Sequence, residues 1–135
     1  MNPYLSPTEY CDSDNPSVYK FARKITSNCN SDIEKSVALF EYIKNHYYYS
    51  FGNWRIKASQ VIKRHFGMCT TKANLLVACL RSLNIPAGFE ILEIKAKEVF
   101  GIFTASNYLK NKISDKSIHI YVKVYLNNKW IKIDP

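Results

Sequence analysis

Residues 118–135, IHIYVKVYLNNKWIKIDP, contain the pattern that decides how the C-terminal half folds. Apolar and polar side chains alternate on both sides of Asn127-Asn128. Such alternation is typical of strands with one buried face, and two Asn residues suit the left-handed positions of a type I′ turn. The stretch therefore predicts an antiparallel hairpin with strands over 118–126 and 129–133.

The register of this hairpin brings a histidine and a carboxylate together. With a two-residue turn, Leu126 pairs with Lys129 and the later pairs follow in step. Tyr121 then lies opposite Asp134, and His119 is the diagonal neighbour of Asp134. Diagonal neighbours are about 7–8 Å apart, which an imidazole and a carboxylate can bridge by a hydrogen bond. One face is expected to be apolar and the other polar or aromatic: Ile120, Val122, Val124, Ile131 and Ile133 against His119, Tyr121, Trp130 and Asp134.

Cys69 is the candidate nucleophile for this pair. It begins a helical run over 69–83, and the free amides and partial positive charge of a helix start favour a thiolate and can stabilise an oxyanion. Between Glu41 and Glu90 the sequence has no acidic residue but seven basic ones: Lys44, Arg55, Lys57, Lys63, Arg64, Lys72 and Arg81. A Cys, a His and an Asp form the set that nucleophilic acyl transfer needs. Taken singly, the same Cys would be read as a small core residue and the His as an exposed strand residue.

The N-terminal half is predicted to be helical. Asn15 is expected to cap a helix that runs to about Ser27, with Pro at its first position. Ser31 begins a capping box for a second helix, which runs toward His46. The apolar face of the second helix is predicted from helical spacing to contain Ile33, Val37, Phe40 and Ile43.

The middle of the chain is less regular. The aromatic connector 47–54 fits either a short strand or a packed loop, and a short helix is expected over 58–64. After Pro86 the pattern changes to β-forming residues, so a strand is predicted over 89–95. Residues 97–117 are polar and weakly patterned, which predicts a long loop.

Two blocks of the chain resemble the transglutaminase-like superfamily. Residues 67–69 (Gly-Met-Cys), a helix and residues 80–87 (LRSLNIPA) are similar to its G-x-C block and L-R-x-x-G-I-P-A ending, with Asn84 in place of the usual Gly. The strand that begins at His119 and the stretch W-x-x-x-D-P over 130–135 are similar to its second block. The resemblance implies an α+β, papain-like core, in which N-terminal helices accompany a cysteine helix packed on an antiparallel sheet.

The resemblance also implies roles and a reaction. By it, Cys69 is the nucleophile, His119 the base and Asp134 the orienting carboxylate. The expected activity is cysteine-dependent acyl transfer on amide, glutaminyl or peptide carbonyls through a thioester, with hydrolysis favoured over crosslinking and a protein or peptide as substrate. The alternative is an inactive module of the same fold that binds a protein or an anionic partner.

Other aromatic and polar residues are weaker candidates. Trp54, Tyr121 and Trp130 are candidates for a substrate cleft, although packing explains them equally well. The chemistry needs no cofactor, and the absence of a C-x-x-C pair argues against a zinc site built from His46, His65 and Cys69. No nucleic-acid motif accompanies the basic residues, so nucleic acid is a minor alternative as partner.

Length and composition set the remaining expectations. A chain of 135 residues with 47% hydrophobic residues suits a single domain over 1–135, the alternative being a fragment of a longer chain. Its net charge of +8 makes an anionic partner worth considering. The absence of a signal peptide or a long apolar run predicts a cytoplasmic protein without a membrane partner. Its four cysteines, Cys11, Cys29, Cys69 and Cys79, are expected to be free thiols there.

Overall fold

The computed structural model describes residues 2–94 and 117–135. The helices are α1 (Pro16–Ile25), α2 (Asp32–His46), α3 (Ala58–Val61) and α4 (Cys69–Ser82); the strands are β1 (Tyr48–Tyr49), β2 (Phe66–Gly67), β3 (Ala87–Ile94), β4 (Ser117–Leu126) and β5 (Lys129–Ile133). The loop predicted over 97–117 lies outside the described residues, except that Ser117 begins β4. In the part of the chain described, no helix is both long and apolar enough to span a membrane.

The main sheet is antiparallel, with strand order β3-β4-β5. Leu126 pairs with Lys129, and the later pairs of the hairpin follow in step, which confirms the predicted register. Asn127 and Asn128 have φ angles of 48° and 63°. Both are left-handed, as a type I′ turn requires, and the twist of this turn matches that of the two strands.

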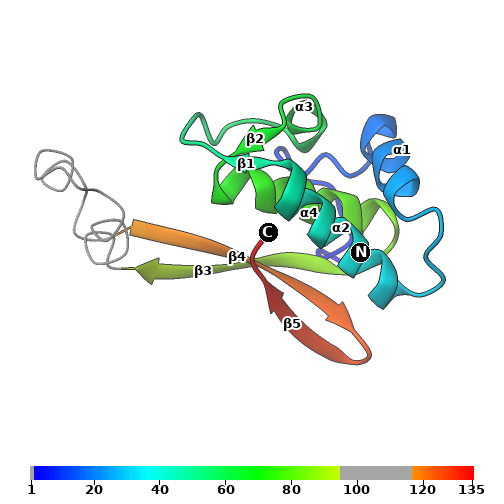
Figure 1. Ribbon diagram of the computed structural model, residues 1–135. Coiled ribbons are helices and arrows are strands. Elements are labelled where there is room, and N and C mark those ends of the chain that lie inside the picture. The colour runs from blue at the N-terminus through cyan, green and yellow to red at the C-terminus, as the bar shows by residue number, and fades with distance from the viewer. Residues whose placement is uncertain (1, 95–116) are drawn as a thin grey trace, which may run out of the picture.

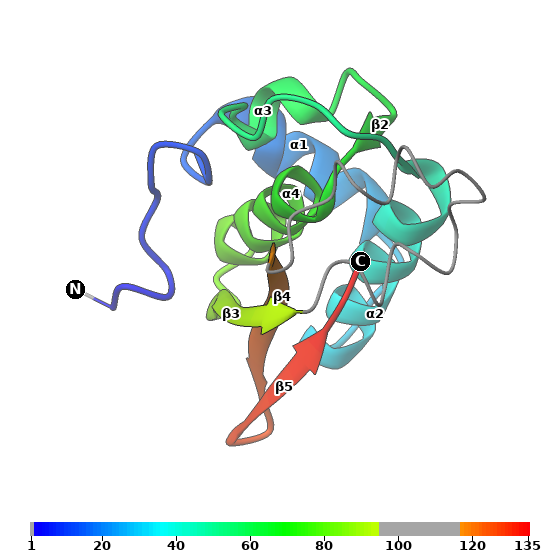
Figure 2. The ribbon, with the colours of Figure 1, turned by 90° about the vertical axis from the view of Figure 1, so that its left-hand side faces the viewer.

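Helix α4 is the centre of the molecule. It lies against the sheet on one side and against α1, α2 and α3 on the others (Figures 1 and 2). Its side chains are buried nearly all round, including Leu75, Leu76, Val77 and Leu80, and β4 contributes the buried Val122 and Val124. A helix that is apolar all round can be stable only in such a central position. The predicted cysteine helix on an antiparallel sheet is thus the observed architecture.

The helix caps follow the sequence closely. The Asn15 side chain accepts a hydrogen bond from the Ser17 N–H, and the Ser31 hydroxyl accepts one from the Glu34 N–H. For the connector after α2, a short strand or a packed loop was predicted. The structure contains both, since the short strand β1 is followed by a loop. β1 pairs in parallel with β2, so the residues just before α4 are tied to the end of α2. α3 is shorter than expected and ends at Val61.

The predicted apolar face of α2 is confirmed only in part. Ile43 is buried and Phe40 packs against the core, as predicted. Ile33 and Val37 are exposed, Val37 by 50%, whereas Ser36 and Leu39 are buried instead. α2 has apolar residues on several sides, so its periodicity does not select one face, and contact with α4 decides it. In the hairpin, Ile131 lies on the predicted apolar face but is 44% exposed, because it is on the edge strand β5.

Candidate functional site

Cys69 is the first residue of α4 and is half-buried. The first hydrogen bond of the helix runs from the Lys72 N–H to the Met68 carbonyl, at 3.0 Å. The amides of Cys69 and the next two residues therefore precede the ladder of helical hydrogen bonds and lie at the positive end of the helix dipole. The first turn of α4 contains no acidic side chain that would oppose a thiolate.

Close packing holds this helix start in place. The Thr71 hydroxyl accepts a hydrogen bond from the Met68 N–H at 3.0 Å. A Cβ atom at Gly67 would lie 2.5 Å from the Thr71 Oγ1 atom, too close for any real contact. Gly67 is thus needed because the chain passes directly over the Thr71 side chain before it turns into α4.

His119 and Asp134 are in contact. The His119 Nε2 atom lies 2.8 Å from the Asp134 Oδ2 atom, so the predicted diagonal hydrogen bond is present. Because Nε2–H donates to the carboxylate, Nδ1 retains the lone pair that a base needs. Tyr121 packs its ring edge-on against the imidazole, with centroids 4.7 Å apart.

Tyr49 connects this pair with the cysteine. Burial raises the pKa of the Tyr49 phenol, and the negative charges of Cys69 and Asp134 raise it further. One phenol therefore lies within electrostatic range of both the candidate nucleophile and the candidate orienting carboxylate. The end of β5 and the start of α4, 65 positions apart in the chain, thus both lie within electrostatic range of β1.

Lys72 is a buried cation below the same site. It lies on α4 one turn after Cys69 and is only 6% exposed. Burial lowers the pKa of Lys72, as does the nearby Lys44, whereas the Asp134 carboxylate raises it. Lys72 is thus a positive charge near Asp134. Sequence reasoning counted it only among the basic residues and missed Tyr49; a lysine on the inner face of an apolar helix was the available signal.

The other cysteines differ sharply from Cys69. Cys11 and Cys79 are buried in the core, and burial raises the pKa of Cys11 to about 11 and that of Cys79 as well. Both are therefore thiols at neutral pH. Cys29 is half-buried like Cys69 but lies in the turn between α1 and α2.

The three cleft candidates lie in different surroundings. Tyr121 is beside His119, as described above. Trp54 packs against Tyr10, at 5.6 Å between centroids, and under the Arg55 guanidinium. Trp130 packs against Tyr4 and Tyr125, near the turn of the hairpin. Packing thus accounts for both Trp side chains, and a cleft role for them stays a prediction.

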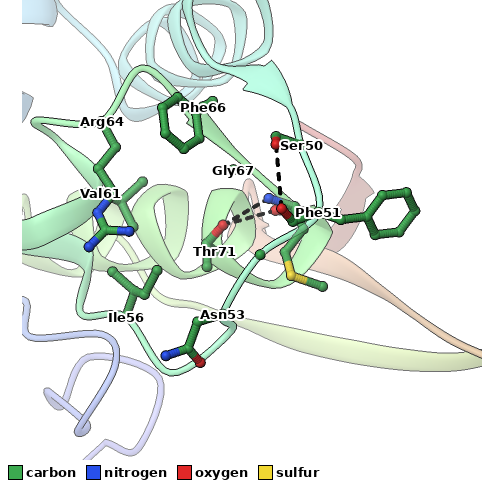
Figure 3. Close-up of a pocket in the computed structure, with 11 residues that line it drawn as sticks. Ser50, Phe51, Asn53, Ile56, Val61, Arg64, Phe66, Gly67 and Thr71 are labelled. Atoms are coloured by element: carbon green, nitrogen blue, oxygen red, sulfur yellow. Dashed lines mark hydrogen bonds between the residues drawn. The ribbon is translucent and has the colours of Figure 1, made fainter.

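A small pocket opens beside the start of α4 (Figure 3). Its volume is about 40 Å³. The loop after β1, helix α3, β2 and the start of α4 contribute its walls, which consist of Ser50, Phe51, Gly52, Asn53, Ile56, Val61, Arg64, Phe66, Gly67, Met68 and Thr71. Among the side chains of this wall, Arg64 is the one that carries a charge. In the described ranges, no group of three or more His, Cys, Asp or Glu residues could hold a metal ion.

Comparison with known families gives a match over most of the chain. The sequence profile described as "Transglutaminase-like superfamily" matches residues 19–135. Among proteins of curated function, none matches the sequence.

Solved structures with the same fold are found as well. A proposed cysteine protease from Cytophaga hutchinsonii is 26% identical, with a TM-score of 0.74 over 98% of this chain and 40% of its own. The periplasmic domain of TgpA from Pseudomonas aeruginosa, bound to ethylmercury, is 15% identical, with a TM-score of 0.64 over 98% of this chain and 46% of its own. A proposed protease from Parabacteroides distasonis is 14% identical, with a TM-score of 0.61 over 93% and 26% of the two chains.

These comparisons support a cysteine-dependent activity in general and the papain-like α+β fold. The chain spans less than half the length of each of the three proteins. Since one of them is a periplasmic domain, the cytoplasmic location expected from the sequence stays a prediction.

Proposed function

The chain belongs to the transglutaminase-like superfamily, and on that premise we propose that it is a cysteine-dependent acyl-transfer enzyme. Cys69 is the nucleophile, His119 the general base and acid, and Asp134 the carboxylate that orients His119. The observation that carries the proposal is the 2.8 Å hydrogen bond between His119 and Asp134. That bond fixes the imidazole tautomer in which Nδ1 can accept a proton.

The reaction proceeds in two steps. In the first, the Cys69 thiolate attacks the carbonyl carbon of an amide, and the oxyanion is stabilised by amides at the start of α4. The C–N bond then breaks, the imidazolium of His119 gives its proton to the leaving amine, and a thioester remains. In the second step, His119 takes a proton from water or an amine as that group attacks the thioester, and the thiolate leaves.

Hydrolysis of a protein or peptide substrate is the reaction we favour. Two of the three similar structures are described as proposed proteases, which supports this choice over crosslinking.

The first test is the pH dependence of Cys69 alkylation by iodoacetamide. A Cys29→Ser background leaves Cys69 as the one half-buried thiol, because the other two cysteines are buried. We expect Cys69 to react well below the pH range of a free thiol, and His119→Ala to remove that low-pH reaction. Alkylation that follows an ordinary thiol titration in both proteins would contradict the proposal.

The second candidate function is an inactive module that binds a partner through the surface around β1 and β2. The observation that favours it is the exposure of the aromatic residues Tyr48, Phe51 and Phe66 within the described part of the chain. In that case Cys69→Ala would leave partner binding unchanged, and no peptide would be cleaved by the unmodified protein. Cleavage that depends on Cys69 would eliminate this candidate.

A further inference from the structure

The register of β1 and β2 places Tyr49 on the same face as Cys69. Tyr49 pairs with Gly67 across the two parallel strands, and paired residues of neighbouring strands point to the same face. Met68 is extended, with φ −93° and ψ 177°, so the alternation continues past it and Cys69 points to the face of Gly67. Strands lie about 4.8 Å apart and rise about 3.3 Å per residue, which puts the Cα atoms of Tyr49 and Cys69 roughly 8 Å apart. Gly67 contributes no side chain between them.

The alternate positions of the same two strands belong to different surroundings. Ser50, Phe66 and Met68 line the small pocket (Figure 3), whereas Tyr49 and Cys69 do not. Side chains at successive positions of a strand point to opposite faces. The lining of the pocket therefore agrees with the register, and Tyr49 and Cys69 share a face outside the pocket.

The Tyr49 phenol is coupled electrostatically to both halves of the candidate site. The negative charges of Cys69 and Asp134 raise its pKa in addition to the effect of burial. The hydroxyl is therefore protonated at neutral pH and can donate one hydrogen bond. Within residues 2–94 and 117–135 it has no hydrogen-bond partner, and the Asp134 carboxylate already binds His119. The phenol is thus an uncommitted donor near the nucleophile.

The ring of Tyr49 is both held in place and accessible. It packs edge-on against Phe51, with centroids 5.5 Å apart. The Ser50 N–H donates to the Gly67 carbonyl at 3.0 Å, which holds the end of β1 against the residues just before α4. The side chain is 52% exposed, so a substrate can reach the phenol. A positioned donor that a substrate can reach is what stabilisation of an oxyanion requires.

We propose that Tyr49 is a catalytic residue, whose phenol donates a hydrogen bond to the oxyanion that forms when Cys69 attacks a carbonyl carbon. As the S–C bond forms, the electron pair of the C=O bond moves to the oxygen, and a donor there binds the transition state more strongly than the neutral carbonyl. The phenol keeps its proton throughout. The inference rests on the proposed function and adds a residue to its mechanism.

Two reactions of Cys69 separate this role from an effect on the thiol itself. p-Nitrophenyl acetate is attacked at its carbonyl carbon, so an oxyanion forms before p-nitrophenolate leaves and Cys69 is acetylated. Iodoacetamide is attacked at its saturated carbon, and iodide leaves without an oxyanion. Both rate constants are measured in the Cys29→Ser background, acetylation from the burst of p-nitrophenolate. The release by Cys69→Ala in the same background is subtracted.

The expected result is a loss confined to acetylation. Tyr49→Phe retains the ring and removes the hydroxyl, and we expect acetylation to slow about 10²-fold, the lower end for loss of one oxyanion donor, because the phenol is half-exposed. Alkylation by iodoacetamide should be unchanged, which also shows that the variant is folded at the site. Tyr19→Phe is the matched control: Tyr19 is 50% exposed and lies on α1, which contributes none of the site residues described above. This control should leave both reactions unchanged.

Three other outcomes would overturn the inference. Acetylation of Tyr49→Phe at the rate of the unmodified protein would reject the role of Tyr49 and leave the proposed function standing. Equal losses of acetylation and alkylation in Tyr49→Phe would show that the phenol acts on the Cys69 thiol and not on an oxyanion. The absence of any Cys69-dependent burst in the unmodified protein would reject the inference, and together with an ordinary thiol titration it would reject the proposed function as well.

Discussion

The two sides of the candidate site differ in how they are built. On one side, Cys69 begins the central helix. His119 lies on β4, which also contributes the completely buried Val122 to the core. On the other side, residues 48–68 form two-residue strands, a one-turn helix and loops with exposed aromatic side chains. The proposed nucleophile and base thus lie on the core, while the exposed aromatic groups, which we propose contact a partner or substrate, lie on irregular surface.

This contrast leads to different expectations for substitutions on the two sides. Changes on the core side should alter the chemistry or the stability by large factors. Changes on the opposite side should alter recognition and leave the fold intact.

Asp134→Asn is expected to have the largest effect, which is on the rate of reaction. The variant keeps the shape of the side chain but removes the charge that stabilises the His119 imidazolium and fixes its tautomer. We expect the rate of thioester formation to fall by about 10²–10⁴-fold, measured with a peptide substrate by burst kinetics. An unchanged rate would show that Asp134 plays no part in orienting the base.

Gly67→Ala should have the next largest effect. Its Cβ would lie 2.5 Å from the Thr71 Oγ1 atom, so either the Thr71 side chain must rotate and lose its hydrogen bonds to Met68, or the backbone at the helix start must move. We expect a loss of about 1–3 kcal/mol in the free energy of unfolding, as for overpacking of a core, measured by urea denaturation. Gly52→Ala is the control, because its Cβ would meet no atom within 4 Å; equal losses in both would argue against the close packing described here.

Lys72→Met should separate stability from activity. Burial lowers the pKa of Lys72 below its ordinary value of 10.5, so at neutral pH the folded protein bears the cost of a buried charge. Between the lowered folded pKa and 10.5, the unfolded chain holds more protons at Lys72 than the folded chain does, so the contribution of this group to stability rises with pH over that window. We expect Lys72→Met to be more stable than the unmodified protein at pH 7, by about 1 kcal/mol, and this gain to shrink as the pH approaches 10.5.

The same variant should react more slowly, because Asp134 loses a nearby positive charge. Urea melts at several pH values and the alkylation profile of Cys69 measure the two effects separately. A loss of stability at pH 7 would show instead that the Lys72 and Asp134 charges hold the end of β5 against α4.

The smallest effect on stability is expected from Phe51→Ser. Phe51 is 74% exposed and lines the pocket beside α4. We expect a change within about 0.5 kcal/mol in the free energy of unfolding, together with a raised KM for peptides. If Phe51→Ser lowers the free energy of unfolding as much as Gly67→Ala does, the division into a core side and a recognition side is wrong.

Local rules were sufficient for the hairpin and the helix starts. The type I′ turn at Asn127 and Asn128 sets the register, so the contact between His119 and Asp134 follows from alternation alone. Caps at Asn15 and Ser31 mark helix starts, because each side chain bonds an amide only two or three residues away. Such signals lie within a few residues and are readable without knowing the fold.

Packing between distant segments decided the buried face of α2 and the surroundings of the candidate site. The buried face of α2 was predicted only in part, since its apolar residues lie on several sides of the helix and only contact with α4 selects Leu39 over Val37. Tyr49 and Lys72 belong to the surroundings of the site because each lies within electrostatic range of Asp134 at the end of β5. The sequence by itself determined the register of the hairpin and the helix start at Cys69; the surroundings of those groups depend on contacts between distant segments, which only the tertiary structure decides.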